Sequence, residues 1–370
     1  MTNLSELVSN KRREIKTDGY AMSIGEWASM YERGELDIHP EFQRFYRWKS
    51  AQKTGLIESI LLGIPLPPIF VSQRKDGVWD VVDGLQRLST IFQFMGLLED
   101  ENKKKVLPLV LDGTKYLPLL KGVSWNDSEN PVKSLPKDLQ LDIKRSKIGV
   151  SIVLKESDEK AKYDLFQRLN TGGSELSPQE VRNCLLVMMN KNLFEWLKEL
   201  PRFPSFINAT SLSDKSIEES YDAELVTRFI SLSLIDEIKL KAIGDVGVFL
   251  TDQITTIAGD KKFKKKLYQN LFTKTFKTID EALGDSAFKR YNSQKNRHEG
   301  GFLLSLFETV ALGVAYNIHR GTLCSSEELS KRVKTLWFTP GFTDYAASGM
   351  RASNRLPRLV PIGRSLFSAE

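Results

Sequence analysis

The spacing of apolar residues predicts a mixed first half of the chain and a helical second half. Leu56, Ile57, Ile60 and Leu61 have the spacing of one buried helix face. Short runs rich in Val and Ile, bounded by turn residues, predict strands. Before residue 190, helices are predicted at 23–34, 51–63, 84–98, 158–169 and 177–189, and strands from Ile69, over 78–82 and over 148–154. The segment 107–120 is interpreted as a further hairpin.

After about residue 190, strand signals become rare and helical spacing continues to about residue 335. We therefore expect an α+β fold, with a mixed domain over 1–190 and a mainly helical domain over 191–370. The most apolar window, 300–317, is shorter than a membrane span of about 20 residues and contains Glu308, so a buried core helix is predicted there. The last segment is expected to be irregular. It carries four arginines, at positions 351, 355, 358 and 364.

Composition and charge narrow the possible functions only slightly. A net charge of +6 over 370 residues is a mild basic bias, which fits a polyanionic partner and equally an ordinary solvated surface. Two cysteines, Cys184 and Cys324, are too few for a disulfide framework or a CxxC zinc pattern. Together with an N-terminus that lacks the apolar core of a signal peptide, they predict a cytoplasmic protein. Three scattered histidines make histidine-based catalysis a poor expectation.

One pentapeptide, Asp83 to Arg87, joins a predicted strand to a predicted helix and has two interpretations. Asp83 is a favoured helix cap, and Gln86 lies where a capping box places Glu or Gln, so the motif could be helix punctuation. Alternatively, the helix start is a phosphate site. Gly84 would let a ligand approach the backbone, Arg87 would donate to phosphate oxygens, and Asp83 would act through a divalent cation or an attacking water.

Two other segments have the residue types of a binding site. Pro40 to Trp48 interleaves aromatic residues and arginines, which can stack a base and bind phosphates or can cap an apolar surface with extended arginines. Residues 170–173, Asn-Thr-Gly-Gly, form either a loop with exposed backbone or an ordinary turn between helices. The sequence on its own leaves both pairs of alternatives open.

Together these segments resemble a known family. The motifs QR-x-Y-x-W, G-I-P-x-P, V-V-D-G-x-Q-R and F-x-R-L-N-T-G-G-x-x-L-S-x-x-E occur in this order. The set is similar to the N-terminal domain of the GmrSD-type (type IV) restriction endonucleases, over about residues 20 to 190. The resemblance implies a ParB/sulfiredoxin-like fold, and nucleotide binding and hydrolysis with D-G-Q-Q-R as the hallmark.

By this resemblance, Asp83 acts at a Mg²⁺ or Mn²⁺ ion or at the attacking water, and Gln86 and Arg87 face the phosphates of an NTP. The pocket is also expected to contain Gln43, Arg44, Arg47, Trp48, Gly84, Arg168 and Asn170. The sequence departs from the hallmark at Leu85, where the family has its first Gln, so hydrolysis is expected to be slow or lost. The histidine signature of the family's nuclease partner domain is missing from the C-terminal half.

Three hypotheses follow. The first is an NTP hydrolase or nucleotide-gated switch in bacterial defence against phage or foreign DNA. The second is a DNA-binding or regulatory module without catalysis, supported by the lysine-rich segment 261–266 and the C-terminal arginines. The third is a ParB-like nuclease, with Asp76 and Asp80 as carboxylates beside Asp83. A nucleotide, DNA and a separate nuclease or defence protein are the expected partners, with no membrane, and an oligomer is left open.

Overall fold

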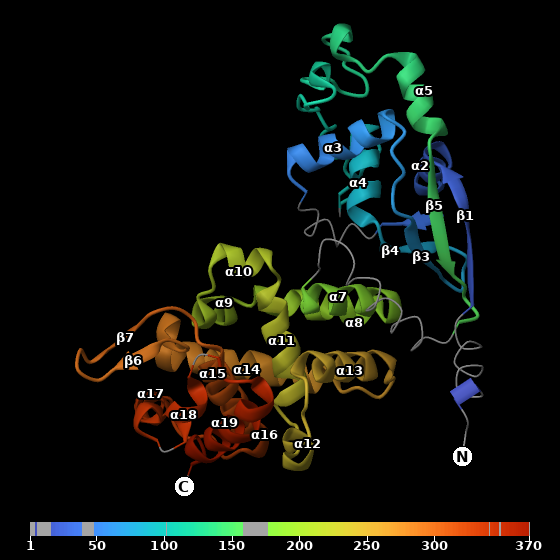
Figure 1. The fold of residues 1–370 in the computed structure, drawn as a ribbon. Helices are drawn as coiled ribbons and strands as arrows, with labels where there is room; N and C mark the ends of the chain where they lie inside the picture. Colours follow the sequence, from blue (N-terminus) through green and yellow to red (C-terminus); the bar gives the residue numbers. More distant parts are fainter. Residues whose placement is uncertain are drawn as a thin grey trace. The chain divides into compact units, whose positions relative to one another are not determined.

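The computed structural model describes residues 4–5, 16–38, 48–100, 102–157, 177–339, 341–347 and 349–369. The chain divides into two compact units, Met1–Glu175 and Leu176–Glu370. The first unit is mixed and the second is mainly helical, so the predicted α+β class is confirmed (Figure 1). The units divide ahead of α7 (Pro178–Met189) rather than near residue 190, because α7 packs with α8 (Lys191–Glu199) and α13 (Val246–Gly259).

A five-stranded mixed sheet organises the first unit. Its order is β1 (Thr17–Ser23), β5 (Lys147–Val153), β3 (Ile69–Gln73), β4 (Trp79–Asp83) and β2 (Leu36–Asp37). The predicted hairpin is confirmed, because β3 and β4 are antiparallel. β3 also lies parallel to β5, so the hairpin is central in the sheet. β1 pairs antiparallel with β5 along its whole length and was not predicted from the sequence.

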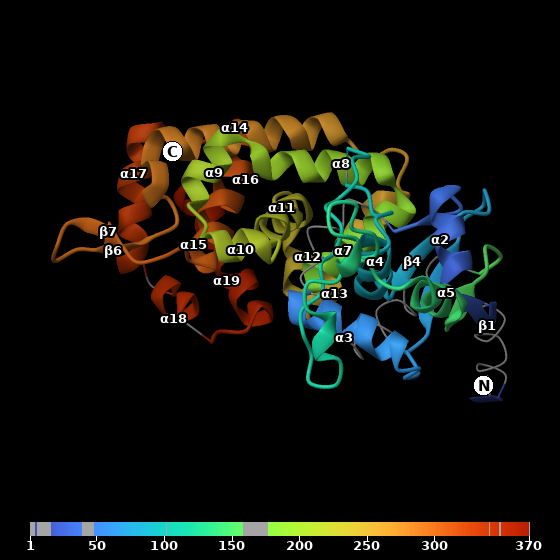
Figure 2. The same ribbon diagram turned by 90° about the horizontal axis from the view of Figure 1, so that it is seen from above.

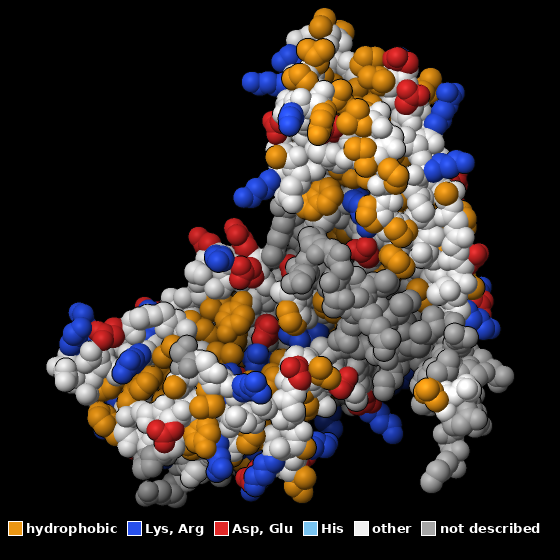
Figure 3. Space-filling view, viewed as in Figure 1, with side chains coloured by type: hydrophobic (Ala, Val, Ile, Leu, Met, Phe, Trp, Pro, Cys, Tyr) orange, Lys and Arg blue, Asp and Glu red, His pale blue; other side chains and the backbone are white. Residues whose placement is uncertain are grey.

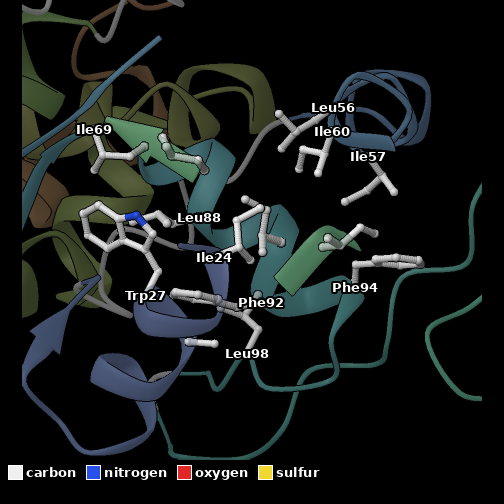
Figure 4. Packing of buried hydrophobic residues seen from close by; sticks show 14 of the residues in the cluster. Ile24, Trp27, Leu56, Ile57, Ile60, Ile69, Leu88, Phe92, Phe94 and Leu98 are labelled. Carbon is white, nitrogen blue, oxygen red and sulfur yellow. The ribbon is translucent and has the colours of Figure 1, made fainter. Parts of the chain in front are cut away.

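The core of the first unit lies between the sheet and its helices, which are α2 (Ile24–Glu32), α3 (Ser50–Leu61), α4 (Leu85–Phe94) and α5 (Lys137–Arg145). The predicted apolar face of α3 is confirmed, since Leu56, Ile57 and Ile60 are all buried. Figure 4 shows these residues on one side of the cluster, with Trp27 and Ile69 on the other. The core therefore fixes α3 and α4 against the strand that precedes the candidate site.

The predicted hairpin over 107–120 is wrong. This segment is coil that ends in a short 3-10 helix, η2 (Pro118–Leu120), and a second one, η3 (Pro131–Lys133), follows. Proline lacks the backbone N–H that a strand ladder needs, and Pro108 and Pro118 interrupt the segment. Leu111 is the buried anchor here, and it is hydrogen-bonded to the backbone of Gly122 and Val123 at 2.8 Å in each case.

The second unit is a helical array that carries one small β-hairpin. Its further elements are α9 (Pro204–Thr210), α10 (Asp214–Glu218), α11 (Tyr221–Leu232), α12 (Glu237–Lys241), α14 (Lys265–Leu283), β6 (Arg290–Asn292), β7 (Arg297–Glu299), α15 (Leu304–Leu306), the π-helical segment η7 (Phe307–Ala311), α16 (Leu312–Arg320), α17 (Ser326–Thr335), α18 (Phe342–Ala346) and α19 (Ala352–Leu366), with 3-10 turns η5 (Leu200–Arg202), η6 (Gly284–Ser286) and η8 (Leu336–Phe338). The helix predicted from residue 177 is confirmed as α7, and a capping box of Ser177 and Glu180 opens it. Within the described part of the chain, no helix is long and apolar enough to cross a membrane.

The irregular C-terminal segment expected from the sequence is in fact mostly helical. α19 spans fifteen residues and contains Pro357 and Pro361, which argue against a helix because proline lacks an N–H donor. Tertiary packing outweighs this local preference. Gly363 lies so close to η7 that a side chain there would collide with the carbonyl of Thr309, and Leu356 and Leu359 of α19 are fully buried.

A buried ion network holds the second unit together at η7. Glu308 is completely buried, and its carboxylate accepts hydrogen bonds from Arg228 Nη1 at 3.0 Å and from Arg355 Nε at 2.6 Å. Arg228 also binds Glu224, at 2.6 Å, and Arg182 reaches the same carboxylate at 3.4 Å. The network therefore alternates three guanidinium groups with two carboxylates and connects α7, α11, η7 and α19.

We expect Glu308→Gln to lower the free energy of unfolding by about 3–5 kcal/mol, because it leaves Arg228 and Arg355 buried without their counter-charge. Urea titration followed by far-UV circular dichroism measures this change. Glu327→Gln is the matched control. Its ion pair with Lys331 is exposed, so a much smaller change is expected. Equal effects of the two substitutions would contradict a stabilising role for the network.

Candidate functional site

The candidate site lies where β4 ends and α4 begins. Gly84 is the N-cap of α4 and has a left-handed backbone, with φ 99° and ψ 9°. A side chain at this position would also collide with Ile69 of β3. Both the backbone conformation and the packing therefore require glycine here.

The capping-box interpretation of Asp83 and Gln86 is wrong. The N-cap is Gly84, one residue later than expected, and α4 has no side-chain cap hydrogen bond. Asp83 is instead the last residue of β4, and its side chain is 40% exposed. The carboxylate is thus not used to close the helix start and faces partly toward solvent.

Arg87 lies one helical turn after Asp83 and fixes the neighbouring loop. Its Nη2 is 3.0 Å from Asp83 Oδ2, and its guanidinium donates to the carbonyls of Pro67 and Pro68. Burial lowers the pKa of Arg87 while the Asp83 carboxylate raises it, and the net shift is downward. Arg87 therefore links the start of α4 to the I-P-L-P-P loop, and its assigned contact with phosphates stays a prediction.

Leu85 and Gln86 occupy the first turn of α4. Leu85 packs against the apolar core of the first unit, as does Trp48. Gln86 is half-buried, and its carbonyl accepts a hydrogen bond of 2.7 Å from Thr90 Oγ1. Leu85, the residue that departs from the D-G-Q-Q-R hallmark, therefore contributes to the apolar core.

Other predicted pocket residues cannot be placed. Gln43, Arg44, Arg47, Arg168 and Asn170 all lie outside the described residues. Of the predicted set, the structure brings together Asp83, Gly84, Gln86 and Arg87 on one junction.

The carboxylates considered for a nuclease have structural contacts. Asp80 is buried and binds Arg74 Nε at 2.8 Å, and Arg74 also reaches Asp37 at 2.6 Å. Burial lowers the pKa of the Arg74 guanidinium, but its hydrogen bonds to Asp80 and Asp37 and their negative charges raise it. The net shift of the Arg74 pKa is upward. Asp76 accepts from the backbone N–H of Val78 within the turn of the hairpin. Across the described ranges, no three His, Cys, Asp or Glu side chains are placed to share a metal ion.

Two of the four C-terminal arginines have internal roles that the sequence did not predict. Arg355 binds the buried Glu308, as described above. Arg364 donates to the carbonyl of Ile235 at 2.7 Å and lies 4.2 Å above the ring of Tyr316. Arg358 lies over the ring of Tyr345, at 5.7 Å, and Arg351 is exposed at the N-cap of α19. Only the last two keep the accessibility that a DNA contact would need.

We expect Gly84→Ala to destabilise the first unit by about 1–3 kcal/mol, because alanine must adopt a left-handed backbone and displace Ile69. Thermal unfolding measures the loss. Gly55→Ala is the control, since Gly55 lies within α3 with no heavy atom near the added carbon, and a gain of up to about 1 kcal/mol is expected there. A Gly84→Ala protein as stable as the parent would refute the proposed constraint.

The comparisons with known proteins address the N-terminal half of the chain. Residues 24–187 match the model of the GmrSD restriction endonuclease N-terminal domain. No curated protein and no solved structure matches the chain. The matched range contains all of β2, β3, β4 and α4, and so the whole junction around Gly84. The resemblance seen in the sequence motifs is therefore confirmed: residues 24–187 are similar to the N-terminal domain of the GmrSD restriction endonucleases.

Proposed function

We propose that the first unit binds an NTP together with Mg²⁺ or Mn²⁺ at the β4–α4 junction, and that this binding serves defence against phage or foreign DNA. The observation that carries the proposal is the partly exposed Asp83 carboxylate beside a helix start that has no side-chain cap. Mg²⁺ commonly takes one or two protein carboxylates and completes its shell with phosphate oxygens and water. A single carboxylate at this position fits that donor set.

The contacts around Asp83 support a bound phosphate. The first N–H groups of α4 carry the partial positive charge of the helix start, which favours an anion. Arg87 holds the Pro67–Pro68 carbonyls beside Asp83, so one wall of the site is fixed before a ligand arrives.

Leu85 supports binding with little turnover. By the resemblance, the family has a Gln at this position, which can orient water or a phosphate, whereas a leucine cannot. Here Leu85 packs on the core, so the first turn of α4 offers one amide side chain, Gln86, instead of two. We infer a nucleotide-gated switch rather than a fast hydrolase.

The test is NTP binding and phosphate release by the full chain, with and without Mg²⁺. Asp83→Asn is expected to weaken Mg²⁺-dependent binding by at least about tenfold, equivalent to about 1.4 kcal/mol. Asp76→Asn is the matched control, because Asp76 lies in the same hairpin and serves only its turn. Binding of no NTP at all would overturn the function, and unchanged binding in Asp83→Asn would overturn the site.

Leu85→Gln tests the second part of the proposal. If Leu85 limits turnover, the substitution raises phosphate release several-fold and leaves the affinity for NTP close to that of the parent. A rate that stays at the parental level would show that another feature limits hydrolysis.

A second candidate function, nucleic-acid binding, is favoured by the lysine cluster, which we define as Lys261, Lys262, Lys264, Lys265 and Lys266. All five are exposed, and the cluster includes the first turn of α14, where no acidic residue is present. Cations at the positive end of a helix oppose its dipole by about 0.3–1 kcal/mol each, a cost that a bound polyanion would relieve. Elsewhere, on the face seen in Figure 3, basic and acidic side chains are interspersed.

Salt dependence tests this candidate. With duplex or single-stranded DNA, the slope of log affinity against log salt is expected to become shallower by about 0.7–0.9 for each contacting lysine replaced by Gln. Lys331→Gln is the control, because Lys331 is already paired with Glu327. A salt response that is flat in the parent would rule out phosphate contacts.

A further inference from the structure

A pocket lies in the helical unit, far along the sequence from the junction at Gly84. It has a volume of about 420 Å³, within the usual range of ~300–1,000 Å³ for ligand sites. One wall is the β6–β7 hairpin, through residues 290–294 and Glu299. The other is formed by Trp337, Phe338 and Thr343. The hairpin extends away from the helices in both Figure 1 and Figure 2.

We propose that this hairpin pocket binds a nucleotide unit, with its base against an aromatic side chain and its phosphate on the surrounding cations. Neither the matched family, which covers residues 24–187, nor the site beside Asp83 accounts for it. The proposal rests on three features: exposed aromatic surface, cations that lie over aromatic rings, and a carboxylate that is already neutralised.

One aromatic side chain of the pocket, that of Phe338, is unusually exposed to solvent. Phe338 is 67% exposed at the rim of the pocket, where burial would otherwise be favourable. The neighbouring ring of Trp337 is fixed edge-on against Phe342, at 5.3 Å between centroids. A fixed tryptophan beside an exposed phenylalanine is the kind of platform on which bases stack.

Cations lie directly over the rings of this pocket. The guanidinium carbon of Arg290 is 5.5 Å from the centre of the Trp337 ring, and Lys334 Nζ is 5.5 Å from that of Tyr291. Lys295 and Arg297 are also exposed on the hairpin, and together with Glu299, which both of them contact, they leave one net positive charge. A planar base and its phosphate would therefore meet π surface and positive charge in the same place.

Glu299 is the one carboxylate among the residues that line the pocket, and its charge is compensated. It accepts a 2.6 Å hydrogen bond from Asn292 and lies 3.3 Å from Lys295 and 3.7 Å from Arg297. The hydrogen bond from Asn292, followed by the two cations, lowers the pKa of Glu299. The acid thus orders the hairpin and leaves Arg290 available to a phosphate.

The hairpin pocket can be tested separately from the lysine cluster. The cluster lies at the start of α14 and the hairpin follows the end of this helix in the chain, so most of a nineteen-residue helix, about 28 Å long in full, lies between them. EDTA in the buffer also removes any contribution from the metal-dependent site at Asp83. Loss of binding at one site therefore does not imply loss at the others.

The experiment measures binding of a fluorescein-labelled oligothymidylate to the full chain in EDTA, with thymidine monophosphate as a competitor. Phe338→Ala and Arg290→Gln change exposed residues and should fold. Phe338→Ala is expected to weaken strand binding by about five- to hundredfold, the range for loss of one stacked base. Tyr116→Ala, an exposed aromatic residue in the first unit, is the control and should leave affinity unchanged.

Competition identifies the source of the nucleotide unit. If thymidine monophosphate displaces the strand, a free nucleotide is sufficient. If it does not, the neighbouring phosphates of a strand are required. An affinity that is the same in the parent, Phe338→Ala and Arg290→Gln would overturn the proposal, as would the absence of binding by both probes.

Discussion

The left-handed backbone at Gly84 is the constraint on which the candidate site depends. It lets β4 turn into α4 without a capping side chain, and it places the first turn of α4 directly against Ile69 in the core. Because glycine performs the cap, Asp83 does not. A carboxylate that a sequence pattern would assign to helix punctuation is left 40% exposed at the edge of a sheet. The backbone of Gly84 therefore takes the structural role of the helix cap, and the Asp83 carboxylate is left for a chemical role.

The ion pair between Asp83 and Arg87 positions the Asp83 carboxylate but is weak enough for a cation to replace it. A partly exposed ion pair at i and i+4 contributes only about 0–1 kcal/mol, so a divalent cation can compete for the carboxylate. Arg87 would not be released by such a change, because the carbonyls of Pro67 and Pro68 still hold its guanidinium. The wall of the site and its carboxylate are thus anchored separately, which allows metal binding without rearrangement of the loop.

Local patterns predicted the fold well where local preference and tertiary packing agree. The α3 face, the β3–β4 hairpin and the Ser177 capping box are examples. They failed where packing outweighs preference, as in α19, which forms around two prolines because Leu356 and Leu359 are buried. In the candidate site, residue type alone could not distinguish a cap at Asp83 from one at Gly84. The hairpin pocket was missed because Arg290 and Trp337 are distant in sequence and share no periodicity.

The basic bias of the chain is informative only once each charge is placed. The Glu308 network holds three guanidinium groups in ion pairs, those of Arg182, Arg228 and Arg355. A fourth, that of Arg364, donates to the carbonyl of Ile235 and lies over the ring of Tyr316. These guanidinium groups count toward the net charge of the sequence, but they are paired inside the second unit and are not available to bind a polyanion. The exposed cations of the lysine cluster lie at the start of α14, and those of the hairpin follow its end in the chain. A nucleic acid would therefore recognise two separate positions on the helical unit, and their spacing, rather than the overall charge, would set the length of strand that contacts both.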